Sequence, residues 1–393
     1  MTAATAFSGL PVQRLQLMAV GAVLLGLFAH LVVIDGSKAS LLIIGVLMGV
    51  ALYHAAFGFT AAYRRAIVDN DISGVAAQGI MLAIAMVLFA PALAQGELFG
   101  RSVVGAIAPV SLSMAFGAWM FGLGMQLAGG CGSGTLLSAG SGNLRMVIAL
   151  VFFCIGGFWG SLDLGWWQTL PGIGSVALGR EWGWGPAVLA QWGFLLAIYG
   201  GLRWLGYRHH RPLMGEQPFT LRALLHGPWP LLLSAGMLAL LNWATLAIAG
   251  HPWSITWAFA LWTAKALAAF GWDPATSAFW ADGFPARALA RPLLQDNTTL
   301  MNIGIMLGAT TAATLAGRLA EASWRIPWKS LLSAVLGGLM LGYGARLAYG
   351  CNIGAFFSGV ASTSLHGWVW ILFAVIGNVV GVRLRPWFGL SDT

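Results

Sequence analysis

Two short segments of the chain place a cysteine among glycines, GGCGSG at 129–134 and YGCNIG at 349–354. The chain has three cysteines in all, and two of them, Cys131 and Cys351, therefore share one context. A thiol is soft and polarizable, and it is a weak hydrogen-bond donor and acceptor. A neutral S–H group would bind an anion weakly and release it easily, whereas a thiolate would repel it. The alternative chemistry is redox, in which these two cysteines form and break a disulfide.

The two cysteine segments belong to a longer internal repeat. Residues 117–138 align with 337–358 at an offset of 351 − 131 = 220 residues. The positions of the first segment that match are Gly117, Met120, Gly122, Gly124, Leu127, Ala128, Gly130, Cys131, Gly134 and Ser138. Apolar helices share leucine and alanine easily, but a cysteine and several glycines in one frame indicate an internal duplication.

The composition shows what kind of protein carries this repeat. Hydrophobic residues make up 59% of the 393 residues and charged residues only 8%, whereas soluble domains carry about 25% charged residues. Such a chain is an integral membrane protein, and we expect an all-α, polytopic fold. The net charge of +8 resides mostly in short loops, which is typical of the positive-inside rule and argues against nucleic-acid binding.

Ten apolar runs are long enough to cross a bilayer, and the charged loops between them predict the topology. The runs are 15–34, 40–60, 74–94, 102–128, 144–164, 186–206, 229–249, 299–316, 330–349 and 366–382. The arginine-rich loops at 203–222 and 318–329 should face the cytoplasm, which gives ten crossings with both termini on that side. An eleventh run, 252–271, is rich in tryptophan and contains Lys265, and we expect a re-entrant segment there.

This topology makes the two repeats inverted, because run 102–128 leads inward and run 330–349 leads outward. The predicted units are an extra N-terminal helix at 1–39, a first transporter repeat at 40–210, a cytoplasmic basic loop at 211–228 and a second repeat at 229–393. In each motif a long helix should end at a Gly-Cys-x-x-Gly turn, where a short half-helix begins. Helix N-termini carry free N–H groups and a partial positive charge, which suit an anion. Inverted-repeat transporters place substrate sites where such broken helices meet.

The two turns supply most of the predicted substrate path. The members of the path at these turns are Cys131, Cys351, Gly130, Gly132, Ser133, Gly134, Gly350, Asn352, Ile353 and Gly354. Three cations are candidates for attracting an anion: Lys265, Arg346 and Arg64. No carboxylate falls well inside an apolar run, which favours channel-like or relay conduction over coupled transport. Nucleotide-binding, triad and metal-ligand patterns are absent from the sequence, so we predict a protein that is no enzyme and carries no cofactor or metal.

These motifs resemble the YeeE/YedE family of bacterial inner-membrane proteins, whose best-understood members take up thiosulfate. The resemblance covers roughly 40–385, and its most specific pieces are GLGMQLAGGCGSG and GYGARLAYGCNIG. It implies an hourglass-shaped inverted repeat whose path cysteines pass the anion inward by transient S–H···S contacts, and a cytoplasmic sulfurtransferase of the TusA type as partner. The family pattern has a third path cysteine, and the best alignment places Gly58 at that position.

The sequence therefore predicts a permease for a small inorganic sulfur-containing anion in the bacterial inner membrane, with thiosulfate as the first candidate. Cys131 and Cys351 are the predicted relay thiols at a constriction. One alternative is a membrane thiol–disulfide or sulfur-handling redox protein that uses the same two cysteines. Another is a transporter of a selenium-containing or organic sulfur anion, which Gly58 in place of the third cysteine would explain.

Overall fold

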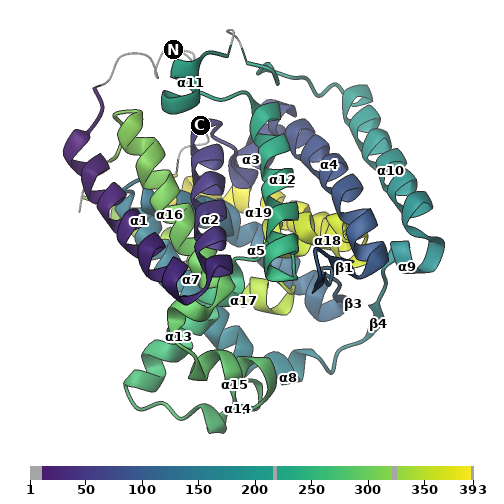
Figure 1. Ribbon diagram of the computed structural model, residues 1–393. Helices are drawn as coiled ribbons and strands as arrows, with labels where there is room; N and C mark the ends of the chain where they lie inside the picture. Colours follow the sequence, from purple (N-terminus) through teal and green to yellow (C-terminus); the bar gives the residue numbers. More distant parts are fainter. Residues whose placement is uncertain (1–10, 216–218, 321–324, 391–393) are drawn as a thin grey trace.

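The computed structural model describes residues 11–215, 219–320 and 325–390, and these residues are mainly helical, with very little sheet (Figure 1). The predicted all-α, polytopic class is confirmed. Among the described residues, nine helical segments are long and apolar enough to cross a membrane. They are α1 (Arg14–Ile34), α2 with α3 (Gly36–Asp69), α4 (Ser73–Gln95), α7 (Leu144–Leu162), α10 (Trp184–Trp204), α12 (Leu231–Ala249), α16 (Asn297–Leu315), α17 through α18 (Trp328–Ala361) and α19 with its last turn η5 (Leu365–Phe388).

The run expected to cross over 102–128 is helical only in its second part. Helix α5 (Leu112–Ala128) has 17 residues, and short strand β3 (Pro109–Ser111) precedes it. Proline disfavours helix in the residue before it, so the helix cannot extend back through Ala108, and the pairing of β3 with β4 keeps residues 109–111 extended. The Ser111 side chain instead accepts a hydrogen bond from the Met114 N–H at 3.1 Å and caps the helix. At 1.5 Å per residue α5 is about 26 Å long, close to the thickness of a bilayer core.

Four shorter helices each follow a long one after a turn. They are α3 (Phe59–Asp69), α6 (Gly132–Gly140), α13 (Thr256–Ala269) and the π-helical turn η4 (Asn352–Phe357), which continues into α18 (Ser358–Ala361). The Trp-rich run expected to be re-entrant forms α13, whose 14 residues span only about 21 Å and cannot cross a bilayer. These short helices follow α2 (Gly36–His54), α5, α12 and α17 (Trp328–Leu347) respectively.

Helices α5 and α17 pack against each other through glycines that the repeat relates. A β-carbon added to Gly117 would lie 2.8 Å from the carbonyl oxygen of Gly344, and one added to Gly124 would lie 2.9 Å from that of Gly337. The repeat offset relates the two contacts, because 117 + 220 = 337 and 124 + 220 = 344. Such reciprocal contacts between antiparallel helices place a two-fold axis across the helix pair. Small residues permit this close approach of two backbones.

The other long helices also pack in pairs that the repeat relates. Helix α5 packs on α19 (Leu365–Leu384) while α17 packs on α7, and α2 packs on α16 while α12 packs on α4. Helices α1 and α10 lie at the outside of the molecule in Figure 1. Only 11% and 17% of the residues in their apolar stretches are buried within the protein. Their exposed leucine, valine and tryptophan side chains suit contact with lipid.

The remaining elements are short and connect the long helices. They are β1 (Glu97–Leu98), β2 (Arg101–Ser102), β4 (Gly172–Ser175), α8 (Leu164–Trp167), α9 (Leu178–Trp182), α11 (Leu221–His226), η2 (Pro274–Thr276), α14 (Ala278–Ala281), α15 (Gly283–Ala290), η3 (Leu293–Gln295) and η5 (Arg385–Phe388). Strands β1 and β2 form an antiparallel hairpin, and β3 pairs with β4. The segment with α14 and α15 inserts between α13 and α16 and protrudes at the bottom of Figure 1. Between α3 and α4, by contrast, the chain has only residues 70–72.

That short link contains a buried carboxylate, Asp71, which is 2% exposed. It accepts hydrogen bonds from Ser73 Oγ at 2.6 Å, from Ser73 N at 2.9 Å and from His210 N at 3.2 Å. The Nε atoms of Arg65 and Arg211 lie 3.8 and 3.7 Å from its Oδ2 atom. Burial raises the pKa of Asp71, but the hydrogen bonds and the charge of Arg211 outweigh burial and lower the pKa below its usual value.

We expect Asp71→Ala to lower the free energy of unfolding by about 2–3 kcal/mol at neutral pH, because several donors lose their acceptor. The two arginines are about one-third exposed (28% and 32%), so water limits the loss. Since the folded-state pKa of Asp71 is lowered, its contribution is complete above the unfolded-state value of about 3.9 and disappears as the pH falls below it. Thermal unfolding in detergent at pH 7 and pH 3.5 measures both effects. Exposed Asp69→Ala is the matched control, and equal melting at pH 7 would contradict the prediction.

Candidate functional site

The first cysteine lies at the turn between α5 and α6. Helix α5 ends at Ala128, Gly129 adopts the left-handed conformation (φ 87°), and Cys131 is the N-cap residue of α6. The Cys131 side chain is 1% exposed, and its Sγ atom lies 3.4 Å from Ser133 Oγ. A β-carbon added to Gly130 would lie 3.1 Å from the backbone nitrogen of Thr135 and 2.8 Å from Met146 Cε, so a side chain there would be tightly packed.

The second cysteine lies at the equivalent turn after α17. Gly350 has φ 148°, a conformation that favours glycine, and Cys351 is the N-cap residue of η4. The Cys351 sulfur is fully buried and accepts a hydrogen bond from Ile353 N at 3.4 Å. Next to it, Asn352 Nδ2 donates to the hydroxyl of Tyr63 on α3 at 3.3 Å. Both cysteines are free thiols.

The two turns meet, as the residues at their centre show. A β-carbon added to Gly132 would lie 2.9 Å from Cys351 Sγ and 3.4 Å from Ile255 Cγ2, while one added to Gly134 would lie 3.7 Å from Cys131 Sγ. Gly132 is the first residue of α6, so the N-terminus of that half-helix touches the thiol of the other repeat. The fold therefore brings together the two segments that lie 220 residues apart in the sequence.

Helix α13 brings its N-terminus to the same region, and α3 reaches it through the side chain of Tyr63. Ile255, which contacts the Gly132 position, is the N-cap residue of α13, and Ser254 Oγ lies 3.6 Å from the β-carbon position of Gly354. Gly58 is the N-cap residue of α3, the helix that carries Tyr63. Around Gly58 there is open space, since an added β-carbon would meet only Ala61 Cβ at 3.8 Å.

Several buried polar side chains around the turns have an atom without a hydrogen-bond partner among the described residues. These atoms are Asn352 Oδ1, Thr60 Oγ1, Trp253 Nε1 and Asn302 Oδ1, all on side chains that are at most 4% exposed. Each of these residues is tied to the site: Asn302 Nδ2, for example, donates to the carbonyl of Ile255 at 3.0 Å. An unsatisfied buried polar group costs free energy. Buried polar groups without a protein partner can form hydrogen bonds with a ligand or a water molecule that is bound only transiently.

The three predicted cations lie at different places. Lys265 is not at the cysteines: it lies ten residues beyond Ile255, about 15 Å along α13, and its Nζ donates to the carbonyls of Leu289 and Arg291 at 2.7 and 2.6 Å. This ammonium group therefore binds the C-terminal end of α15. Arg64 lies on α3, beside Arg65 of the Asp71 cluster.

Arg346 lies in the last turn of α17, five residues before Cys351. Its guanidinium carbon is 5.6 Å from the ring centre of Trp257 and 5.1 Å from that of Phe279, within the range of cation–π attraction. The buried Nε atom has no hydrogen-bond partner among the described residues. The repeat equivalent is Gln126, which is uncharged and fully buried and donates from Nε2 to Asn378 Oδ1 at 2.6 Å. Arg346 thus has no charged equivalent at the same position of the other repeat. The first cysteine turn has other arginines beside it, because Arg145 donates to the carbonyl of Leu127 and Arg385 to that of Gln126, each at 2.8 Å.

The sequence-based selection missed several polar residues of the site, namely Tyr63, Thr60, Trp253, Ser254 and Asn302. A signal for some of them exists, because Asn302 and Thr60 are polar residues inside or at the edge of apolar runs. Nothing local distinguishes Tyr63 or Trp253 from ordinary aromatic packing residues. The assembled arrangement has two thiols, helix N-termini from both repeats, and the unpaired indole N–H of Trp253 and hydroxyl of Thr60. These groups can donate hydrogen bonds to a small polarizable anion without a covalent step, whereas the unpaired amide oxygens accept and are suited to water.

Comparison with known proteins shows which family the sequence matches. The sequence model of a family described as Sulphur transport matches residues 54–380, which include both cysteine turns. The thiosulfate transporter TsuA of Spirochaeta thermophila is 27% identical over 354 residues, 86% of this chain and 96% of that protein. The probable transporters YedE of Escherichia coli and Salmonella typhimurium are 31% and 32% identical over 158 residues, 40% of this chain and 37% of each relative.

The family match covers 380 − 54 + 1 = 327 of the 393 residues, far more than half of the chain. The resemblance to the YeeE/YedE family is thereby confirmed, as is the prediction of a transport protein that is not an enzyme. With both cysteine turns inside the matched range and apolar helices throughout, this multi-pass membrane protein belongs to the Sulphur transport family.

Proposed function

We propose that this protein conducts thiosulfate across the bacterial inner membrane, with both termini in the cytoplasm, through a constriction that Cys131 and Cys351 form. The observation that carries the proposal is the meeting of the two cysteine turns, in which the Gly132 position of one repeat touches the sulfur of the other. A relative over most of this chain is named a thiosulfate transporter.

The chemistry of the constriction suits a sulfur anion. Thiosulfate carries a soft terminal sulfur and a hard oxyanion end. Thiol S–H groups can donate weakly to the soft end, while free backbone N–H groups at the half-helix N-termini stabilise the negative charge. Because each of these contacts is weak, the anion leaves as readily as it enters. Both thiols are buried, so each passage requires a local opening of the turns.

The charges flanking the cysteines fit an entrance and an exit. On the predicted outer side, Arg346 is the cation nearest to Cys351 in the chain and faces aromatic rings rather than a carboxylate. On the predicted cytoplasmic side, α3 leads from Tyr63, which binds Asn352, to Arg64 and Arg65. We expect a cytoplasmic sulfurtransferase of the TusA type to receive the anion at this basic face.

Growth tests the cargo. The gene is expressed in a bacterium that lacks its sulfate and thiosulfate importers, with thiosulfate as the sole sulfur source, and uptake of radiolabelled thiosulfate is measured in parallel. We expect growth and uptake with this protein and neither with the empty vector. No uptake, with the protein present in the membrane, would exclude thiosulfate and direct the assay to selenium-containing and organic sulfur anions.

Gly58 provides a gain-of-function test of the relay. Its backbone is extended (φ −113°, ψ 125°) and the surrounding space is open, so Gly58→Cys should fold normally. A third thiol on the path adds one weak hydrogen bond to the anion, and we expect thiosulfate uptake to rise by roughly 2- to 10-fold. Gly58→Ala is the matched control, since it adds the same β-carbon without sulfur. Equal uptake by the Cys and Ala variants would show that sulfur at this position contributes nothing.

A further inference from the structure

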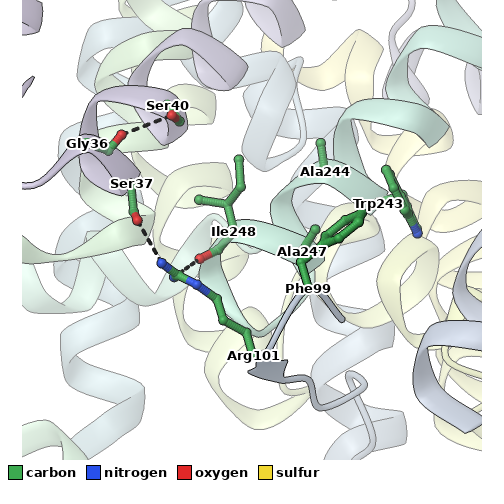
Figure 2. A pocket seen from close by; sticks show the side chains of 9 residues that line it. All are labelled: Gly36, Ser37, Ser40, Phe99, Arg101, Trp243, Ala244, Ala247 and Ile248. Carbon is green, nitrogen blue, oxygen red and sulfur yellow. Dashed lines mark hydrogen bonds between the residues drawn. The ribbon is translucent and has the colours of Figure 1, made fainter. Parts of the chain in front are cut away.

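A cavity of about 460 Å³ lies away from the cysteine turns, between the start of α2, the β1–β2 hairpin and the end of α12 (Figure 2). Its lining residues are Gly36, Ser37, Ser40, Phe99, Arg101, Trp243, Ala244, Ala247 and Ile248. Helices α2 and α12 are both of membrane-crossing length. A cavity at their ends therefore lies where the apolar interior of the membrane meets water.

The polar end of the cavity is built around Arg101. Its guanidinium group donates to Ser37 Oγ at 2.9 Å and to the carbonyl of Ile248 at 2.5 Å, and Figure 2 shows it between these two helix ends. The hairpin that carries it is fixed by a hydrogen bond from Val104 N to Gly250 O at 2.9 Å. A guanidinium group has five N–H donors, so donors remain for a further acceptor.

The other ionisable groups nearby leave this end close to neutral in charge. The Asp35 carboxylate accepts from Ser37 N at 2.8 Å and caps α2. Lys38 donates from Nζ to Gln295 O and to Asn297 Oδ1, and Glu97 pairs with Ser102 across the hairpin. Arg291 and Asp296 also lie near Lys38. With three cations and three carboxylates, the cavity offers one directed cation and no excess negative charge to oppose a phosphate.

The apolar end continues as an exposed stripe toward the middle of the membrane. On α2, Ile43 and Leu47 follow Gly36 and Ser40 at helical spacing and are 39% and 40% exposed. On α12, Leu240 lies on the face of Trp243 and Ala247 and is 53% exposed. From Ser40 to Leu47 this stripe is about 10 Å long. Trp243 and the exposed Phe99 form an edge-on pair, with ring centres 6.2 Å apart, at the mouth, a position that aromatic rings favour at membrane interfaces.

We propose that this cavity binds one phospholipid, with its phosphate on Arg101 and one acyl chain along the stripe between α2 and α12. Arginine binds phosphate oxygens through parallel N–H donors, and basic pockets between membrane helices bind lipid headgroups. The graded lining, cationic at the water side and apolar toward the membrane, matches an amphiphile better than a free anion. Helix α2, in the first repeat, packs on α12 and α16, in the second. A lipid between α2 and α12 therefore contacts helices of both repeats.

Binding of dioleoylphosphatidylglycerol to the delipidated full-length protein in detergent, measured by native mass spectrometry, tests this site. We expect one tightly held lipid per chain, with affinity reduced at least about tenfold by Arg101→Gln. Ala244→Trp, which fills the cavity and keeps Arg101, should reduce it likewise. Arg180→Gln removes an exposed arginine elsewhere and should change nothing. Melting temperatures verify that each variant is folded.

Two competitors separate the possible ligands. Dioleoylglycerol has the acyl chains without the phosphate, and glycerol 3-phosphate has the phosphate without the chains. We expect neither to displace the phospholipid at equal concentration. Displacement by dioleoylglycerol would show an acyl groove without headgroup recognition, and displacement by glycerol 3-phosphate would show a site for free anions. Either result, or wild-type binding by Arg101→Gln, would overturn the proposal.

Discussion

Cells that depend on this protein for thiosulfate should stop growing when Cys351 is changed to alanine. The Cys351 sulfur lies where the two repeats meet, buried and 2.9 Å from the β-carbon position of Gly132. Replacing it with a methyl group removes the polarizable donor from the proposed constriction. A hydrogen bond to a charged group contributes about 1.5–3 kcal/mol, which corresponds to a loss of transport rate of about 10- to 100-fold. Radiolabelled uptake into vesicles with equal amounts of protein measures the loss.

Serine at the same position separates transport from redox chemistry. A hydroxyl group donates a hydrogen bond but cannot form a disulfide, so Cys351→Ser should retain part of the uptake if the thiol acts as a donor. Complete loss in Cys351→Ser, together with a reversible crosslink between Cys131 and Cys351 in the wild type, would favour the redox alternative. Cys154→Ala is the matched control, since this cysteine lies within α7, and its repeat equivalent at 374 is already alanine.

The second large effect is expected at Gly132, where Gly132→Ala should close the constriction while both cysteines remain. The added methyl group would lie 2.9 Å from Cys351 Sγ and 3.4 Å from Ile255 Cγ2. The first distance is well inside the ordinary contact range, so one of these groups must move into the path. We expect uptake to fall by at least about tenfold, and the overpacking to cost about 1–3 kcal/mol of stability.

Gly134→Ala is the control for this prediction, because it adds the same methyl group on the same half-helix. There the nearest atom is Cys131 Sγ at 3.7 Å, an ordinary van der Waals contact. We expect nearly normal uptake from this variant. If the two variants transport equally well, the close approach of Gly132 to Cys351 does not limit conduction, and the path must run elsewhere.

The turns around the two cysteines were predictable from the sequence because their chemistry is local. Glycine at a left-handed position and a cysteine at a helix N-terminus are determined by a few neighbouring residues, and the frame repeats at 131 and 351. The start of α5 was not predicted well, since hydropathy continues through 102–128 while Pro109 and the pairing of β3 with β4 prevent helix there. Hydropathy along the sequence indicates which residues are buried more reliably than it indicates where a helix begins.

The partners of the turns could not be predicted, because they come from distant parts of the chain. Tyr63 approaches Asn352 only after α3 folds back, and nothing near Tyr63 in the sequence indicates this contact. Lys265 looked like a cation within a membrane helix, yet the inserted segment with α14 and α15 supplies carbonyl groups that bind it. A charge in an apolar run is a guide to function only when its own helix cannot satisfy it and no neighbouring segment does so.

The reciprocal glycine contacts of α5 and α17 have a consequence for the direction of flux. A scaffold with a two-fold axis in the membrane plane presents the same conduit to both sides, so it cannot by itself distinguish inward from outward flow. Kinetic asymmetry must arise where the repeats differ, as at Arg346 and its equivalent Gln126. A charge that one repeat carries and the other lacks at the equivalent position changes the anion concentration at which its own face of the protein saturates. It leaves the equilibrium distribution unchanged, because the gradient of the anion and the membrane potential alone determine where net movement stops.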